Sequence, residues 1–536
     1  MQRIAVQCDL AIPTSLNCRS KRGARGTADR MPIMSSRPSP RFRSPFLLCF
    51  ASRVACTTAS RTAPSPGLAS VAFAHATVID VRDGGEHADQ TVVVAGHRIV
   101  KVGPSNRVAL PPNVRVVDAR GKYLIPGLWD MHAHALRQDR IDTFLPLYVG
   151  NGVTGVRDIG ISGLPNVDSA LADFERSKRT RYEIAARVGA IPRIVAAGVI
   201  VSGNGRVWPS SIEVTDTLAA RRAVTTLKAR GADFIKVYNF IPRDAYFALA
   251  REARKQRMSF VGHAPDFASL AEASDSGQRS VEHLGNLLVA CSLDEERIET
   301  QIRNLIRRLD DPRPEITRLR NNTAAELLTG YNDAKADSLF ARLARNRTWQ
   351  VPTLIVIKTF ANLTDSAFTR AHKDEWLRYI PATLRETLSP AGDWRQRVRT
   401  ESPQIVANQR KLFDKSLELV GKMQRAGVPI LAGTDVPPLS ATGFNLHDEL
   451  ALLVQAGLTP AEALRTATWN PARFLGRERD LGTIEEGKLA DLVLLDDDPL
   501  ADVSSTRRIR GVMVDGRYFD RAALDDVLAQ VERSAR

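Results

Sequence analysis

The chain has 536 residues, of which 43% are hydrophobic and 25% charged, as is typical of a folded globular protein. This length suits one large barrel with an accessory domain, or three ordinary domains. The formal charge of +15 would suggest a nucleic-acid or membrane partner if it were evenly spread. However, residues 1–66 hold eleven basic residues against only Asp9 and Asp29, so the rest is mildly basic and we expect no nucleic-acid partner.

Residues 1–66 are rich in Arg, Ser, Pro and Thr and show no helical or strand periodicity, so we interpret them as a disordered or targeting tract. Residues 41–56 resemble a secretory or lipoprotein signal, although Arg53 interrupts the apolar run. Cytoplasm and export therefore both remain open, and a misassigned start codon is an equal alternative. Only Cys291 lies beyond the tract, which argues against a disulfide framework. No apolar stretch reaches the roughly 18 residues of a transmembrane helix.

Both ends of the remaining chain read as short strands joined by turns. Residues 67–125 form the first group and residues 473–536 the second, which also ends in a helix. The strands are expected at 74–80, 91–95, 97–101, 114–118, within 482–496, and at 509–515. We therefore predict a small β-sandwich domain built from both ends of the chain.

Between these ends, residues 126–472 alternate apolar strand-like runs with amphipathic helical stretches. The strands are expected at 124–134, 153–158, 193–201, 234–238, 259–263, 280–283, 351–356 and 429–435. Helices are expected at 216–230, 243–255, 267–275 and 413–426. Eight strands, each followed by a helix or loop, predict an α/β fold of the (β/α)8 TIM-barrel type. Residues 292–348 and 360–412 are charged, helical and too long for ordinary connections, so we interpret them as insertions near the barrel mouth.

Residues that can bind metal fall where a barrel places its active site, at the C-terminal ends of the strands. They are His132, His134, Lys236, His263, His283 and Asp435. His132 and His134 are two positions apart, so on a strand their imidazoles share one face. Imidazole and carboxylate bind zinc and related ions. Each residue alone could be structural, but together they predict a metal centre.

Lys236 stands out because an ammonium group cannot bind a cation and is costly to bury between Ile235 and Val237. A deprotonated lysine could instead react with carbon dioxide and form a carbamate, an anion able to bridge two metals. The alternative is an ordinary lysine that reaches solvent from the strand end.

Seven phrases resemble the amidohydrolase superfamily, and the resemblance covers roughly residues 69–520. They are Pro-Gly-Leu-Trp-Asp-Met-His-Ala-His at 126–134, Asn-Gly-Val-Thr-Gly-Val-Arg-Asp at 151–158, Phe-Ile-Lys-Val-Tyr at 234–238, Gly-His-Ala at 262–264, Glu-His-Leu-Gly at 282–285, Ala-Gly-Thr-Asp at 432–435, and Gly-Thr-Ile-Glu-Glu-Gly-Lys-Leu-Ala-Asp-Leu at 482–492. Within the superfamily, the chain is most similar to binuclear hydrolases related to imidazolonepropionase and to prolidase-like and ochratoxinase-like enzymes.

The resemblance implies a role for each ligand. His132, His134 and Asp435 would hold one divalent ion, expected to be zinc, and His263 and His283 would hold the second. Carboxylated Lys236 and a hydroxide would bridge the two ions. Two cations lower the pKa of a shared water, and Asp435 would accept its proton and return it to the leaving nitrogen.

Three residues are candidates for substrate binding, because similar proteins use Tyr and Arg in this region to hold a substrate carboxylate. They are Tyr238, Arg157 and Arg206. His447 is expected to pack or cap the last helical layer instead of binding metal.

These features predict a metal-dependent amidohydrolase that cleaves a carbon–nitrogen bond of a dipeptide or N-acyl amino acid. The main alternative is a mononuclear deaminase or cyclic-amide hydrolase acting on a heterocycle such as an imidazolone, but such enzymes generally lack the bridging lysine. A non-catalytic barrel usually loses ligands, and none is lost here. We expect a small-molecule substrate and a homo-oligomer.

Overall fold

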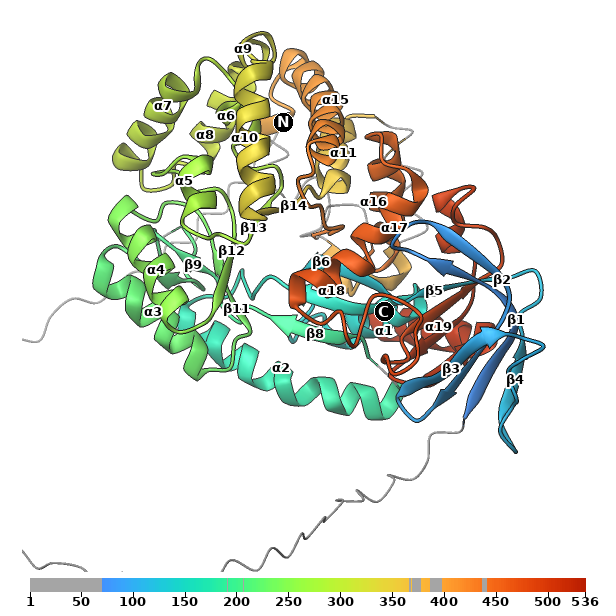
Figure 1. Ribbon diagram of the computed structural model, residues 1–536. Helices are drawn as coiled ribbons and strands as arrows, with labels where there is room; N and C mark the ends of the chain where they lie inside the picture. Colours follow the sequence, from blue (N-terminus) through green and yellow to red (C-terminus); the bar gives the residue numbers. More distant parts are fainter. Residues whose placement is uncertain are drawn as a thin grey trace, which may run out of the picture. The chain divides into compact units, whose positions relative to one another are not determined.

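A computed structural model describes residues 70–189, 191–205, 207–365, 368, 377–385, 398–435 and 441–536 (Figure 1). The N-terminal tract, its signal-like segment and Arg206 lie outside the described residues. Ser65–Arg536 form a unit of their own, to which everything below refers. Among its described helices, none combines the length and the apolar character needed to span a bilayer.

The two ends of this unit meet in one eight-stranded sheet, where blue strands lie beside red ones in Figure 1. Its strands are β1 (Val71–Asp80), β2 (Gly85–Ala95), β3 (Arg98–Pro104), β4 (Arg115–Asp118), β5 (Tyr123–Pro126), β15 (Leu492–Leu495), β16 (Ile509–Val514) and β17 (Arg517–Asp520). The order is β17-β16-β15-β5-β1-β2-β3, with β4 also paired to β1. The described end strands all belong to this sheet, so the predicted sandwich of two sheets is not confirmed.

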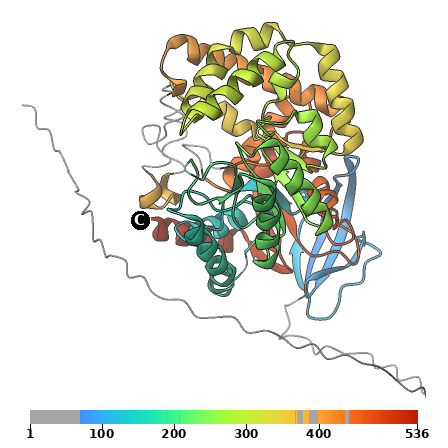
Figure 2. The same ribbon diagram turned by 90° about the vertical axis from the view of Figure 1, so that its left-hand side faces the viewer.

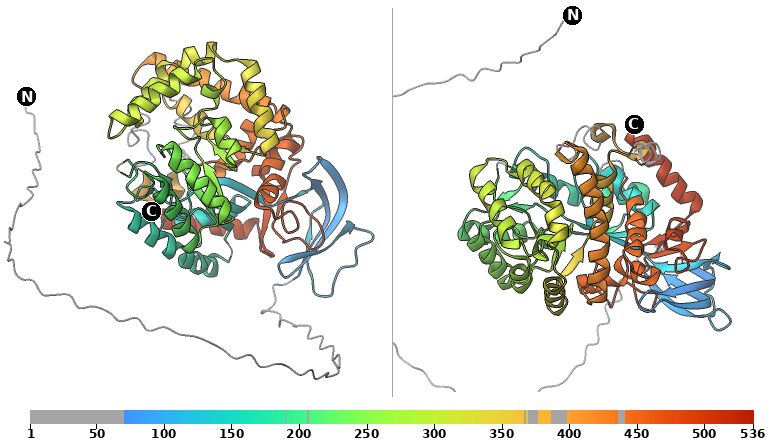
Figure 3. Two further views of the ribbon diagram at one scale, coloured as in Figure 1. Left: turned by 60° about the vertical axis from the view of Figure 1, so that its left-hand side comes forward. Right: turned by 90° about the horizontal axis from the view of Figure 1, so that it is seen from above.

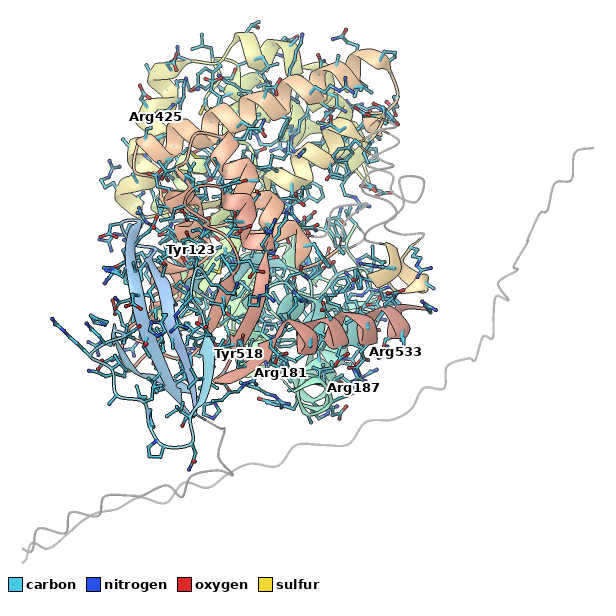
Figure 4. All side chains as sticks on the ribbon, turned by 90° about the vertical axis from the view of Figure 1, so that its right-hand side faces the viewer. Tyr123, Arg181, Arg187, Arg425, Tyr518 and Arg533 are labelled. Atoms are coloured by element: carbon cyan, nitrogen blue, oxygen red, sulfur yellow. The ribbon has the colours of Figure 1, made fainter. Side chains whose placement is uncertain are left out.

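The pairing of β15 with β5 joins the C-terminal segment to the N-terminal one, with Leu492 opposite Pro126. The sheet is mixed, since β4 and β5 run parallel to β1. Its core includes the edge-to-face contact of Phe73 with Tyr518, whose ring centroids lie 5.1 Å apart (Tyr518 is labelled in Figure 4). Aromatic pairs of this geometry add to the stability that area burial gives.

The middle of the chain has a TIM-barrel-like α/β arrangement of parallel strands. The strands fall into two sheets, one of β6 (Leu128–Ala133), β7 (Val153–Asp158) and β8 (Arg193–Ala196), and one in the order β10 (Ile212–Glu213), β9 (Val201–Ser202), β11 (Phe234–Val237), β12 (Ser259–Gly262), β13 (Ser280–Glu282) and β14 (Trp349–Val351). Among the described strands, no single sheet closes on itself, so the closed barrel is confirmed only as a barrel-like arrangement.

Backbone hydrogen bonds outside these strands connect the two sheets. Leu431 N donates to Gln350 O at 2.9 Å, and Met131 N donates to Ala432 O at 2.9 Å. Residues 429–435, expected as the last strand, therefore lie between β14 and β6, although they form only an isolated bridge, at Ile430. At the other junction, Asp233 N donates to Ala196 O at 2.8 Å.

Helices pack their apolar faces on these strands, and several begin at side-chain caps. Around the strands lie α1 (Ile141–Gly150), α2 (Val167–Val188), α3 (Thr217–Ala229), α4 (Arg243–Lys255), α5 (Leu270–Asp275), α16 (Phe444–Gln455), α17 (Pro460–Thr466) and α18 (Trp469–Leu475), and α19 (Arg521–Ala535) ends the chain. Asp216 accepts from two backbone amides and so fixes the start of α3. Arg187 of α2, labelled in Figure 4, pairs with Asp142 of α1 at 2.6 Å.

Most helices of the two expected insertions gather on one side of the strands, yellow-green to orange in Figures 2 and 3, whereas η1 (Leu377–Tyr379) packs against the C-terminal helix α19. The first contains α7 (Glu295–Arg308), α8 (Arg313–Asn322), α9 (Ala324–Thr329) and α10 (Asp333–Asn346), preceded by α6 (Leu287–Ala290); the described part of the second contains the end of α11 (Leu354–Asn362), η1, α13 (Ala382–Arg385) and the start of α15 (Pro403–Arg425). The strand expected at 351–356 is wrong beyond Val351, where β14 ends, because α11 begins at Leu354. The apolar residues at the start of α11 are buried, and in the sequence they resembled a strand.

Candidate metal centre

Three of the six predicted ligands form a tight cluster where the strands end. Ligand atoms of His132, His283 and Asp435 all lie within 4.8 Å of one another. His134 Nε2 lies 3.4 Å from an oxygen of Asp435. The rings of His263 and His283 are 5.1 Å apart between centroids. All four imidazoles and the carboxylate are therefore neighbours, although up to 303 positions separate them in the sequence.

Each of the four imidazoles is held through Nδ1, so that Nε2 is left for another partner. Nδ1 of His132 lies 2.7 Å from Glu282 Oε2, Nδ1 of His134 lies 2.8 Å from Gly160 O, Nδ1 of His263 lies 2.7 Å from Asn239 Oδ1, and Nδ1 of His283 lies 2.8 Å from Thr353 Oγ1. Metal-binding histidines characteristically donate their second N–H to such acceptors, which fixes the tautomer and aims the free nitrogen. The donor set therefore fits divalent cations.

Glu282 and Arg157 form a buried ion pair beneath the cluster. Arg157 Nη2 lies 3.0 Å from both oxygens of Glu282, and its Nε donates to Met131 O at 2.6 Å. Both side chains are fully buried. The structure does not bring Arg157 to a surface that a substrate could reach, because its donors point at the support of His132. The substrate contact expected for Arg157 is therefore replaced by a positioning role.

Two buried aspartates, which the sequence analysis did not single out, fix the backbone of the site. Asp130 accepts from His132 N and Thr434 N at 3.1 Å, and so ties the first strand end to the segment that carries Asp435. Burial raises the pKa of Asp130 to about 7. Asp158 accepts from Gly160 N at 3.0 Å and so positions the carbonyl that contacts His134. Both are strand residues within the motifs, but only the fold reveals their partners.

Glycine at position 433 allows the strand of Asp435 to approach that of His132. A Cβ there would lie 2.7 Å from His132 Cβ and 2.6 Å from Val351 Cγ1, closer than real side chains come. Asp435 and His283 themselves have φ angles of 57° and 62°, in the left-handed region. Such backbone costs about 1–3 kcal/mol per residue and concentrates at functional sites, where it aims side chains that regular strands could not.

Burial favours the neutral form of His132, His263 and His283, which is the form that binds metal. It lowers the pKa of His132 and of His263 well below the ordinary value, and that of His283 to about 4. Burial also lowers the pKa of Lys236 to about 8, against the opposite effect of Glu282 and Asp435. Lys236 makes no hydrogen bond or ion pair with any described residue, although it lies close enough to affect the titration of the buried imidazoles.

The cluster is open on one side. The side chains of His134, Asp435 and His283 are 20%, 22% and 24% exposed, whereas that of His132 is 1% exposed. Lys236 is equally buried. A molecule that enters the site would therefore meet Asp435 and the outer imidazoles, with Lys236 and His132 beneath them.

The ring centroid of Tyr238 lies 4.0 Å from that of His263, so Tyr238 is a neighbour of the candidate site. Arg206 lies outside the described residues. Arg320 of α8, which the sequence analysis missed, acts electrostatically on His263 and Asp266. Its Nη2 donates to Asn286 Oδ1 at 2.7 Å. The insertion thus brings a guanidinium group near the site, which no local signal in an Arg-rich helix could reveal.

His447 lies in α16, with Nδ1 3.0 Å from Thr506 Oγ1 and Nε2 3.1 Å from Asn151 O. Both ring nitrogens thus hold α16 to neighbouring segments, in agreement with the expectation that His447 packs the last helical layer.

Comparisons with known proteins point to one superfamily. A sequence profile of the amidohydrolase family matches residues 384–518. An uncharacterized protein of Mycobacterium bovis is 28% identical over 183 residues, 34% of this chain and 40% of the relative. The chain therefore matches less than half the length of the first curated relatives. An imidazolonepropionase of Symbiobacterium thermophilum is 25% identical over 77% of this chain and 87% of its own.

Solved structures show the same fold at low identity. A putative prolidase from Bifidobacterium longum has a TM-score of 0.57 and 23% identity, and the match covers 87% of this chain and all of the other. Bottromycin amidohydrolase has a TM-score of 0.65 and 23% identity, over 87% of this chain and 90% of its own. At this level of identity, the likenesses show a shared fold alone.

Proposed function

Because the chain belongs to the amidohydrolase superfamily, we propose that it is a metal-dependent hydrolase of carbon–nitrogen bonds that cleaves a dipeptide or an N-acyl amino acid. The observation that carries this proposal is the set of four imidazoles, each held at Nδ1, around the carboxylate of Asp435. Such a set has no structural purpose in an apolar barrel, where burying so many polar groups is costly.

The resemblance to binuclear amidohydrolases suggests which residues would hold each metal. His132, His134 and Asp435 would hold one divalent ion and His263 and His283 the other, and zinc suits imidazole and carboxylate donors. Bound cations supply Lewis acidity and lower the pKa of a nearby water. The site also needs a negative charge beneath the imidazoles if it is to hold two cations close together.

Lys236 would supply that charge as a carbamate. Its neutral amine would attack carbon dioxide, so that a nitrogen–carbon bond forms and a proton leaves to solvent. Two features support this step: Lys236 lacks a partner among the described residues, and burial brings its pKa to about 8, so that the neutral amine is accessible near physiological pH.

Asp435 would act as the proton shuttle. It is partly exposed and lies next to His134 and His283, so that it can reach both an attacking water and the substrate. An amide needs this, since its nitrogen leaves only after protonation. Within this proposal, Asp435 takes the proton from water and delivers it to the leaving nitrogen.

Tyr238 and Arg320 would bind the acidic end of the substrate. Burial lowers the pKa of Arg320, while Asp266 and Tyr238 oppose that shift, so Arg320 faces both. It uses one of its five N–H donors on Asn286 and keeps the others free of described partners. An arginine so placed can bind a carboxylate with two parallel hydrogen bonds.

Metal analysis and a lysine variant test the proposal. Purified protein should contain about two divalent ions per chain, and Lys236→Ala should lose nearly all activity. Short carboxylic acids added to that variant should restore part of the activity, because they can replace the carbamate. A single ion per chain, together with an active Lys236→Ala variant, would falsify the binuclear centre.

A second candidate is a cyclic-amide hydrolase, favoured by the likeness to imidazolonepropionase over most of the chain. A panel of dipeptides, N-acyl amino acids, imidazolones and purine or pyrimidine rings separates the two. Turnover of dipeptides supports the first proposal, whereas ring opening or release of ammonia supports the second.

The site further implies a closed ring of eight strands, which we propose with residues 430–435 as the eighth member. Hydrogen bonds from this segment to Gln350 and Met131 support the closure. A crystal structure with metal bound would test it by the regularity of these contacts.

A further inference from the structure

Four arginines surround a cavity at the end of the strands opposite to the metal centre. The cavity has a volume of about 440 Å³ and is lined by Arg254, Arg279, Arg347 and Arg473, among others. It lies where β12, β13 and β14 begin, since Ser259 starts β12, Arg279 precedes β13 and Trp349 starts β14. His263 and His283 follow the far ends of β12 and β13, so this cavity is separate from the candidate metal centre.

The positive charge in this cavity is only partly balanced by acidic groups. Glu478 is the only carboxylate among the described residues that line it. None of the four guanidinium groups comes within 4 Å of a carboxylate in the part of the chain that the structure describes. Arg254 donates to Ser276 O at 3.0 Å and Arg279 to Phe474 O at 2.7 Å, while the guanidinium groups of Arg347 and Arg473 make no hydrogen bond to a described residue.

The walls strengthen the attraction for an anion. Met258, Phe260 and Trp349 contribute apolar surface, and a low-dielectric wall makes charge interactions stronger than they are in water. The arginines come from four elements, so their clustering arises from the fold and not from a basic run in the sequence.

We propose that this cavity binds a small oligophosphate, such as a diphosphate group, between the four guanidinium groups. Planar guanidinium donors match phosphate oxygens in pairs, and Arg is preferred over Lys for this reason. The cavity falls within the usual range of about 300–1,000 Å³ for small-molecule sites and is larger than one phosphate requires. Three or four cations would balance the charge of a diphosphate.

Titration calorimetry of the full, metal-loaded chain with inorganic pyrophosphate tests this inference. We expect one saturable site per chain that weakens as salt increases. The double variant Arg347→Gln, Arg473→Gln should bind at least about tenfold more weakly for each guanidinium removed, because it loses charge-assisted hydrogen bonds. The two guanidinium groups make no described hydrogen bond, and that of Arg473 only lies over the Trp349 ring, so the variant should fold, which thermal melting checks.

The double variant Arg221→Gln, Arg222→Gln is the matched control. It removes the same charge from exposed positions on α3 and should bind pyrophosphate like the wild type. If pyrophosphate affinity fell equally in both double variants, the loss would arise from net charge alone, and the proposed site would be contradicted. Pyrophosphate can also bind metals, so Asp435→Asn is titrated in parallel. Binding that is lost in Asp435→Asn and kept in the arginine variant would place the ligand at the metal centre and overturn the inference as well.

Discussion

Glu282 links a candidate ligand to a buried support, since it accepts hydrogen bonds from His132 Nδ1 and from Arg157. We predict that Glu282→Gln weakens metal retention by about 10- to 100-fold, because His132 loses the carboxylate that fixes its tautomer. Metal content after dialysis against graded chelator concentrations measures this. Glu478→Gln, far from the site, is the control. Unchanged retention in Glu282→Gln would contradict the assigned role.

Arg157 distinguishes a supporting residue from one that contacts substrate. Arg157→Met should lower the free energy of unfolding by about 3–5 kcal/mol, because Glu282 is left as an unpaired buried charge. Denaturant unfolding measures the loss. If the variant instead unfolded like the wild type and changed only KM, Arg157 would be a substrate contact, as first expected from the sequence.

Arg320 should show the opposite behaviour. Arg320→Met is predicted to raise KM about 10- to 100-fold for a substrate with a free carboxylate, because a charge-assisted bidentate contact is lost. The same substrate blocked as an amide should be affected little. Steady-state kinetics on the two substrates checks this, and equal effects on both would show that α8 only supports the fold.

At the scale of elements, His447 makes the packing of α16 dependent on pH. Burial lowers the pKa of His447 to about 3, below its value near 6.5 in the unfolded chain. The unfolded state therefore binds more protons, and the stability that neutral His447 provides is complete above pH 6.5 and falls as pH drops toward 3. Between pH 7 and pH 5 the loss should be about 2 kcal/mol.

His447→Gln should remove that part of the pH dependence. Urea unfolding at pH 7 and pH 5 gives the change in the free energy of unfolding with pH for each protein. Subtracting the change in the variant from that in the wild type leaves the contribution of His447, because the other histidines contribute equally to both. The same pH dependence in variant and wild type would mean that His447 titrates normally and that α16 is not held through it.

At the scale of the whole molecule, catalysis should need only Ser65–Arg536. These residues contain every described ligand and both ends of the eight-stranded sheet. Removal of residues 1–66 should leave kcat/KM within about twofold of the full chain. A much larger loss in a folded, metal-loaded variant would show that the N-terminal tract contributes to the site.

Metal removal should affect stability as well as activity, because the buried imidazoles and Asp435 would lose their common partner. At ion concentrations about 1,000 times Kd, binding stabilises a native state by about 4 kcal/mol. Chelation should therefore lower Tm and abolish activity together, and added zinc should restore both. Full activity after chelation, with the removed metal verified by analysis, would contradict a metal-dependent mechanism.

The sequence alone determined the superfamily and the residue types of the site. His132 and His134 at one strand end, with Lys236 and Asp435 at others, are local signals, because strand periodicity and motif spacing are short-range properties. Strand and helix limits were equally accessible where apolar runs were regular, as in β7 and α4. The ends of the last two expected strands could not be predicted. Residues 351–356 and 429–435 are short apolar runs, in which periodicity does not distinguish a strand from a helix.

Only the tertiary structure decided which residues support the ligands. Glu282, Asn239 and Thr353 become partners of imidazoles through contacts between separate elements, and no local pattern marks them. The same holds for Arg157, which burial turned from a substrate contact into a support, and for Arg320, which a distant insertion brings to the site. The physical reason is that the chemistry of a side chain depends on its residue type alone. Its burial and its hydrogen-bond partners depend on chain segments that meet only in the folded protein.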